Sequence, residues 1–228
     1  KRETETTANY SAYMSVSNLG KTLDFFGPEE IRQGLTTFTD KGYDTDWLDA
    51  ITRTAFTHNH NFNITGGNKK TTYSADFTYR KEEGTILNTW SESMRMRFDV
   101  SHWMLNDMLK VNLNMVKSRH KSGPVSGSGV YRYAIMRNPT EPIYNEDGSY
   151  YENFGINYYY NPVGMLQEVE GESTNENTRM TGNITFEPIK GWQTNLMLAR
   201  NTTMTHGRNF QTSDHYSQVL AYRTGYAS

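Results

Sequence analysis

Residues 56–80 form two unlike rows when every second residue is read. Because successive side chains of a β-strand point to opposite faces, this period predicts strands with one apolar and one polar face. The short run 66–70, GGNKK, has the Gly and Asn content of a tight hairpin turn. The apolar row consists of Phe56, His58, His60, Phe62, Ile64, Tyr73, Ala75, Phe77 and Tyr79, and the intervening positions are mainly Asn, Thr, Ser and charged residues.

The same alternation recurs along most of the chain. It appears in residues 10–16, 94–101, 109–115, 180–187 and 192–199. Together with the opening pair, these segments predict seven strands, and a less regular eighth strand is possible near 215–226. The chain is therefore predicted to be an all-β protein with an antiparallel up-and-down sheet.

The predicted strands are joined alternately by short and long connections. Short ones lie at 66–70, about 104–108 and 187–191, whereas 17–55 and 117–178 are long and 81–93 is intermediate. The first long connection contains two candidate short helices, within 27–38 and 44–53. In a meander this alternation places all short turns at one rim, a layout typical of a transmembrane β-barrel with long extracellular loops.

The composition agrees with strands that have only one apolar face. The chain has 228 residues, of which 35% are hydrophobic, and it is rich in Tyr (16), Met (11) and Phe (10). Its mean hydropathy is −0.79. A polar face fits a wet lumen, because the same residues facing lipid would cost several kcal/mol each. The net charge of −2 argues against nucleic acid as a partner, and the absence of Cys excludes disulfides and thiolate metal sites.

Two other architectures share the alternation. A secreted β-sandwich that binds glycans would bury its apolar rows against a second sheet. A small closed barrel would use seven or eight strands alone, as an adhesin or anchor. The sandwich gives no reason for the asymmetry in loop length, and the loop of about sixty residues within 117–178 argues against the small barrel.

Several separated phrases resemble SusC/RagA-type TonB-dependent outer-membrane transporters. The most specific is YDTDWLDAITRTAFTHNHNFNITGGNKKTTYSADFTYRKEEGTI at 43–86, which resembles the early barrel of that family. RNPTEPIYNEDGSYYE (137–152) and YYNPVGML (159–166) are similar to its long extracellular loop, and TRMTGNITFEPIKGWQTNLML (178–198) to the next hairpin. The resemblance covers nearly the whole chain.

This resemblance implies that residues 1–228 are part of a barrel of about 22 strands. The plug domain, TonB box and signal peptide would lie outside this sequence. The whole protein would sit in the outer membrane of a Gram-negative bacterium, in contact with its lipid. It would import oligosaccharides, or less often peptides, with a SusD-like surface lipoprotein as lid and TonB as the source of force.

Two groups of residues are candidates for contact with ligand or lid. An aromatic cluster in the second long loop could stack on sugar rings or pack against a partner; loop self-packing is the alternative. This cluster consists of Tyr144, Tyr150, Tyr151, Phe154, Tyr158, Tyr159 and Tyr160. Arg95, Arg97 and Asp99 share the polar face of one strand and are predicted to face the lumen, where they would form a charge-paired wall or contact the plug or substrate.

The remaining motifs favour structural readings. His58 and His60 form an H-x-H pair, but no third metal ligand accompanies them and their face is the apolar one. NEDGSY at 145–150 is too short for an EF-hand loop and predicts a β-turn. No catalytic constellation is visible. The sequence predicts no enzymatic activity, no cofactor and no metal site.

Overall fold

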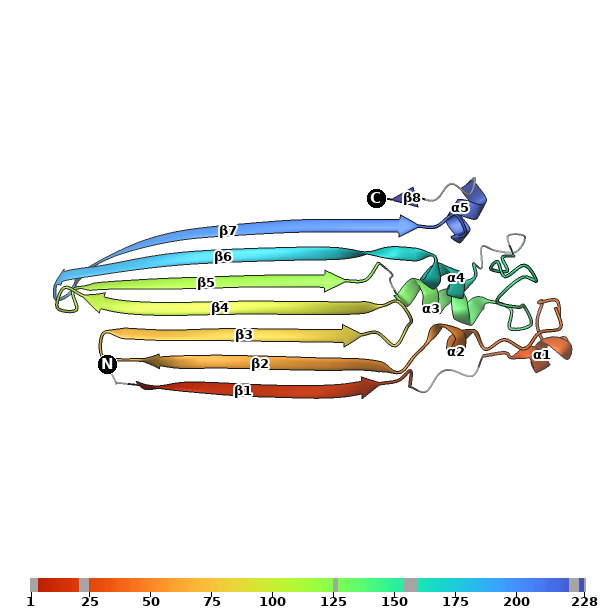
Figure 1. The fold of residues 1–228 in the computed structure, drawn as a ribbon, viewed down its shortest axis with the longest axis horizontal. Helices are drawn as coiled ribbons and strands as arrows, with labels where there is room; N and C mark the ends of the chain where they lie inside the picture. Colours follow the sequence, from red (N-terminus) through yellow and green to blue (C-terminus); the bar gives the residue numbers. More distant parts are fainter. Residues whose placement is uncertain (1–3, 21–24, 125–126, 154–159, 222–225, 228) are drawn as a thin grey trace.

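The computed structural model describes residues 4–20, 25–124, 127–153, 160–221 and 226–227. Its strands form one antiparallel sheet in which each strand pairs with its neighbours in chain order, as Figure 1 shows. The strands are β1 (Thr4–Ser17), β2 (Ala55–Gly67), β3 (Thr71–Glu83), β4 (Trp90–Met104), β5 (Leu109–Ser122), β6 (Val169–Ile189), β7 (Trp192–Gln211) and β8 (Tyr226–Ala227).

The two ends of the sheet differ as the connection lengths predict. The β2–β3, β4–β5 and β6–β7 turns lie at one end, and all helices lie at the other (Figure 1). The helices are α1 (Pro28–Arg32), α2 (Trp47–Ile51), α3 (Gly127–Met136), α4 (Pro162–Gln167) and α5 (Tyr216–Ala221). None of the helices in the described ranges is long and apolar enough to cross a membrane.

Turn chemistry explains the short connections. In the first turn, the Asn68 side chain accepts hydrogen bonds from the backbone N–H groups of Lys70 and Thr71, both at 2.9 Å. In the second, Leu105, Asn106 and Asp107 all have positive φ angles, a conformation that Asn and Asp tolerate better than most residues. Such turns help to set the register of the strands that they join.

The seven predicted strands are confirmed, and several extend beyond the predicted alternation. β5 runs to Ser122 and β6 begins at Val169, so the connection predicted at 117–178 spans only residues 123–168 and contains α3 and α4. The alternation fades in these extensions because both faces there carry polar residues. The irregular segment near 215–226 forms α5, and β8 begins only at Tyr226.

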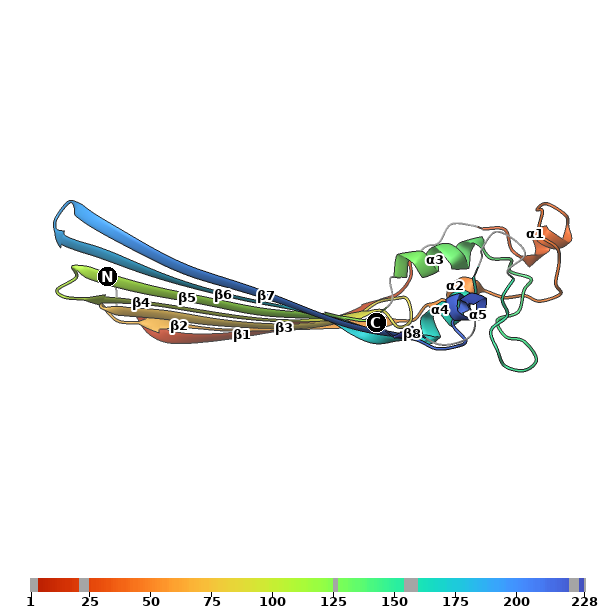
Figure 2. The same ribbon diagram turned by 90° about the horizontal axis from the view of Figure 1, so that it is seen from above.

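The apolar face of the sheet has no second layer of protein against it among the described residues. Figure 2 shows a single layer of strands, and side chains such as Phe98 (47% exposed) and Leu198 (65% exposed) are open. The β-sandwich alternative is therefore wrong. Within the described strands, β1 pairs only with β2 and β8 only with β7, so the sheet is open and the small closed barrel is not formed.

The apolar rows form a belt that crosses the strands obliquely. Ala12, in the apolar row of β1, is connected through the paired residues of successive strands to Met204 on β7. The apolar residues of β7, however, centre near Leu196. The belt thus shifts by about eight residues along the strands over the six strand spacings from β1 to β7. At ~3.3 Å per residue and ~4.8 Å per spacing, this shift means that the strands are tilted by roughly 40° from the perpendicular to the belt. Strands of transmembrane barrels tilt by about 35–45°, so the belt would lie level in a bilayer.

The buried core of the chain lies outside the sheet. It gathers at the loop end from three elements distant in sequence, and we call this assembly the loop hub. Its buried apolar members are Trp47, Ile51, Val130, Ala134, Val163 and Leu166. The strands therefore provide the wall, and the loops provide their own small core above it.

Candidate functional site

The face opposite the apolar belt is a wall of amide, hydroxyl and charged side chains. Asn side chains bridge neighbouring strands: Asn61 Nδ2 donates to Thr78 Oγ1 at 2.9 Å, and Asn177 Nδ2 donates to Thr203 Oγ1 at 2.9 Å. The same two amides also donate to Asp76 Oδ2 at 3.4 Å and to Asn201 Oδ1 at 3.1 Å, so their N–H groups are used and their carbonyl oxygens remain as acceptors. The wall can therefore hydrogen-bond a polar solute along its length.

The predicted charged residues Arg95, Arg97 and Asp99 lie together on this wall in β4. Arg97 Nε lies 2.7 Å from Asp99 Oδ2, and Asn114 donates to the other oxygen of the same carboxylate at 2.5 Å. Arg95 faces Thr78 and Ser118 across the two neighbouring strands. One cation is thus paired with a carboxylate and the other stands among hydroxyl groups. Their contact with plug or substrate stays a prediction.

The loop hub begins from two capped helices. The Asp46 side chain accepts hydrogen bonds from the N–H groups of Leu48 and Asp49, which start α2. The Asn161 side chain accepts from Val163 and Gly164, which start α4, and its own amide donates to the Ile143 carbonyl at 2.8 Å. Side-chain capping of this kind typically stabilises a helix by about 1 kcal/mol. These caps explain why Asp46 directly precedes Trp47 and why Asn161 directly precedes Pro162.

A buried ionic cluster holds the hub together. The side chain of Arg137 is 0% exposed, and its Nε and Nη1 lie 3.4 Å from Glu141 and 3.6 Å from Glu152. Its Nη2 donates to the Tyr151 carbonyl at 2.6 Å, and its guanidinium lies 4.8 Å from the centre of the Trp47 ring. The cluster therefore ties the 17–55 connection to both ends of the hairpin at 137–153.

Burial shifts the ionisation of this cluster. It raises the pKa of the Glu152 carboxyl to about 7, against the opposing effects of the Asn161 backbone N–H and the Arg137 guanidinium. Burial likewise lowers the pKa of Arg137, and the two carboxylates oppose that shift. Two carboxylates around one guanidinium carry one excess negative charge, so protonation of Glu152 makes the cluster neutral.

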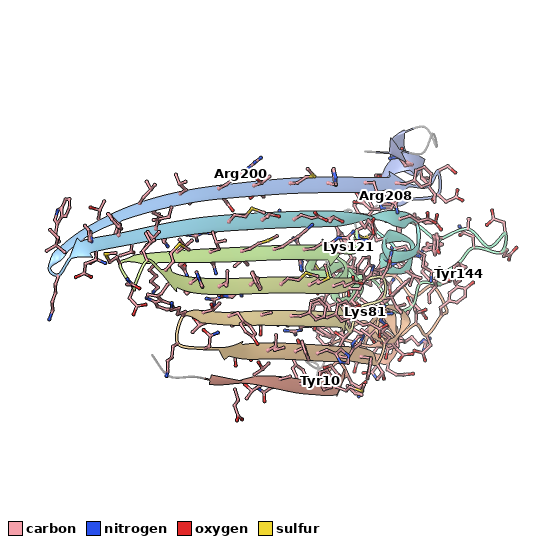
Figure 3. All side chains as sticks on the ribbon, turned by 60° about the vertical axis from the view of Figure 1, so that its left-hand side comes forward. Tyr10, Lys81, Lys121, Tyr144, Arg200 and Arg208 are labelled. Carbon is pink, nitrogen blue, oxygen red and sulfur yellow. The ribbon has the colours of Figure 1, made fainter. Side chains whose placement is uncertain are left out.

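Of the predicted aromatic cluster, Tyr144 presents an open ring. It is 46% exposed and lies at the loop end, far from the turns (Figure 3). It flanks the tip Asn145–Ser149 and pairs with Tyr150 in a two-residue bridge. The tip is the predicted β-turn, in which Asp147 Oδ1 accepts from the Ser149 N–H and hydroxyl.

Other members of the cluster pack within the loops. The Tyr150 hydroxyl donates to Gln167 at 2.8 Å, and the Tyr151 ring lies 5.8 Å from the Arg137 guanidinium. Tyr160 stacks on Tyr216 with ring centres 3.9 Å apart. Phe154, Tyr158 and Tyr159 lie outside the described residues.

A second exposed patch, around α1, was not identified from the sequence. Its apolar side chains Phe25, Phe26, Leu35 and Tyr43 are open to solvent. Beside it lies a hollow of about 310 Å³ between the start of α1, the start of α2 and the end of α3. The sequence shows no periodic pattern for this patch, because the patch lies in irregular loops. The pair Phe25-Phe26 in an otherwise polar connection was the one sequence feature that could have indicated it.

The histidine pair belongs to an aromatic ladder on the apolar face. His60 Nε2 lies 3.2 Å from His58 Nδ1, and the Tyr10 hydroxyl lies 2.7 Å from His60 Nδ1. The rings are therefore hydrogen-bonded to each other. In the part of the chain that the structure describes, no group of three or more His, Cys, Asp or Glu side chains is placed to hold a metal ion.

No protein-family model matches the sequence. The chain is 28% identical over 153 residues to TonB-dependent receptor P26 of Formosa agariphila, covering 64% of this chain and 15% of the relative. It is 27% identical over 160 residues to TonB-dependent receptor SusC of Bacteroides thetaiotaomicron, covering 64% and 16%. The chain thus spans about a sixth of the length of these curated relatives, whose names describe receptors and not enzymes.

Solved structures share the fold. The RagAB peptide importer in its closed-closed state matches with a TM-score of 0.71 at 18% identity, over 95% of this chain and 30% of the importer chain. The open-open state matches with a TM-score of 0.71 at 16% identity, over 93% and 29%. In both comparisons the chain matches less than a third of the importer chain.

Proposed function

We propose, from the confirmed likeness to SusC/RagA-type TonB-dependent transporters, that residues 1–228 are part of the barrel wall of an outer-membrane importer. The observation that carries this proposal is the bare apolar belt, tilted by roughly 40° against a continuous polar face. A bilayer on one side and water on the other would satisfy both faces of such a sheet. The plug, the TonB box and the rest of the barrel would come from sequence outside these residues.

The helix-bearing end would be extracellular, and a SusD-like surface lipoprotein would cover it. The exposed patch of Phe25, Phe26 and Leu35 supports this assignment, because open apolar groups at a loop tip favour a protein partner. The buried Arg137 cluster would hold the loops rigid beneath that partner. TonB would act from the periplasmic side, where the short turns lie.

The substrate proposed for this importer is an oligosaccharide. Its hydroxyl groups match the Asn, Thr and Ser wall, which bridges strands through neutral hydrogen bonds. The open ring of Tyr144 at the outer end could stack on a sugar face. Neither feature requires charge on the substrate.

A peptide substrate is the alternative, and one observation favours it. The matching solved structures are those of a peptide importer. The ionic residues Arg97 and Asp99 on the wall could pair with peptide termini or charged side chains. Charge recognition by the wall would then matter more than ring stacking by Tyr144.

Growth on defined substrates tests the choice. A strain that has the full-length protein as its sole importer is grown on oligosaccharides or on peptides as the limiting nutrient. For an oligosaccharide importer, Tyr144→Ala should slow uptake by about tenfold, while Tyr144→Phe, which keeps the ring, should not. Growth on peptides alone, insensitive to Tyr144→Ala, would replace the proposal with its alternative.

A further inference from the structure

The loop-side edge of the apolar belt changes character along the sheet. On β1 and β2 the edge is formed by the hydrogen-bonded rings of Tyr10, His60 and His58. On β5 and β7, Lys117 and Arg200 come directly after the apolar residues Met115 and Leu198 on the same face. The belt edge is therefore formed by aromatic and imidazole rings on β1 and β2 and by cations on β5 and β7.

The register brings the two cations of this edge near each other. Met115 pairs with Met180, which pairs with Arg200, and Lys117 lies on the next row toward the loops. Two strand spacings and one row correspond to about 12 Å between their Cα atoms, a separation that the two long side chains can span together. Figure 3 shows Arg200 on β7 farther from the helices than Arg208.

Within the described residues, these cations are only partly balanced by carboxylates. Arg200 has no ion pair or hydrogen bond with any other residue in the described ranges. Lys117 lies 3.9 Å from Glu176, a carboxylate that Arg119 approaches more closely, at 3.3 Å. Farther toward the loops, Glu172 lies 3.4 Å from Lys121 and 3.7 Å from Arg208. An excess of positive charge thus remains at the belt edge.

A hollow in the belt adjoins this charge. Gly182 has no side chain to fill the space between Leu113 and Leu198, its partners on β5 and β7. The hollow has a volume of about 500 Å³ and Arg200 lies on its lining, together with Phe98, Leu113, Met115, Met180 and Leu198. It is apolar where the bilayer's hydrocarbon would lie and cationic where headgroups would lie.

We propose that this hollow and its cationic edge bind one anionic phospholipid, whose phosphate headgroup carries a net negative charge. An acyl chain would occupy the space over Gly182, and its phosphate would lie between Arg200 and Lys117. A guanidinium near the edge of the hydrocarbon reaches the headgroup level by extending its side chain, and a phosphate there accepts a guanidinium bidentately. The inference rests on the proposed membrane placement and is independent of the substrate imported.

The test uses the full-length transporter in detergent, with retained lipid measured by native mass spectrometry after addition of equal phosphatidylglycerol and phosphatidylcholine. The unsubstituted protein should retain the anionic lipid about tenfold better, and the double substitution Lys117→Gln with Arg200→Gln should abolish this preference. Arg208→Gln is the matched control, because Arg208 lies on the same face of β7 but is paired with Glu172. Inorganic phosphate should not displace the lipid.

A third variant tests the hollow without changing charge. A Cβ at position 182 would meet Leu113 at 3.5 Å, an ordinary contact, so Gly182→Leu should fold and exclude the acyl chain. Retention of the lipid by both the double variant and Gly182→Leu, or equal loss in Arg208→Gln, would overturn the proposal. Absence of a preference in the unsubstituted protein would also overturn it, and unchanged substrate uptake would leave the proposed import function standing.

Discussion

Replacing Arg137 by Met should loosen the loop hub while leaving the barrel wall intact. Met fills a similar volume but removes the charge that Glu141 and Glu152 face at 3.4 and 3.6 Å. Breaking a buried ion pair by removing one partner typically costs 3–5 kcal/mol. The lost hydrogen bond to the Tyr151 carbonyl adds about 1 kcal/mol, and partial protonation of Glu152 offsets a similar amount. We expect the free energy of opening the hub to fall by about 4 kcal/mol.

Amide hydrogen exchange in the full-length protein measures this change. A loss of about 4 kcal/mol corresponds to exchange roughly a thousandfold faster, in segments 41–53 and 137–153 and not in the strands. The control is Arg132→Met, which removes an exposed cation of α3 and should leave exchange unchanged.

A triple variant tests whether the unpaired carboxylates cause the loss of protection. Changing Glu141 and Glu152 to Gln together with Arg137→Met removes the stranded charges, and most of the protection should return. If exchange in Arg137→Met rises less than tenfold, or rises equally in Arg132→Met, then the ionic cluster does not hold the hub.

Three further predictions concern the hub and the belt. The pKa of Glu152 in the folded protein is raised to about 7. Its contribution to the stability of the hub is therefore fully present below pH 4.5 and is lost as the pH rises through 7, a loss of about 3 kcal/mol. Protease cleavage of the loops should increase accordingly by pH 8, and Glu152→Gln should remove this pH dependence. Ile51→Ala, at a fully buried position, should destabilise the hub by 2–5 kcal/mol in the same exchange assay, and a smaller loss would mean that the hub collapses around the cavity. Phe98→Arg in the belt should lower the free energy of unfolding in lipid by about 2–4 kcal/mol, whereas Ser118→Arg on the polar face should not; equal effects would contradict the assignment of the two faces.

The wall of this protein was predictable from local sequence. Alternation in β2 and β3 requires only that successive side chains point to opposite faces, and the turn at Asn68 needs only residues close in sequence. The two short helices of the first long connection were also predictable, from Pro28 at a helix start and Asp46 at a cap.

The loop hub was decided by tertiary structure. The Trp47 indole donates to the Asn138 carbonyl at 2.9 Å across 91 positions of sequence, and no periodic pattern records such a contact. The same holds for the aromatic cluster, in which Tyr151 is half-buried beside Arg137 and Tyr144 is left open. Strand faces follow from the geometry of adjacent residues, whereas burial in irregular loops depends on segments that meet only once the sheet has brought them together.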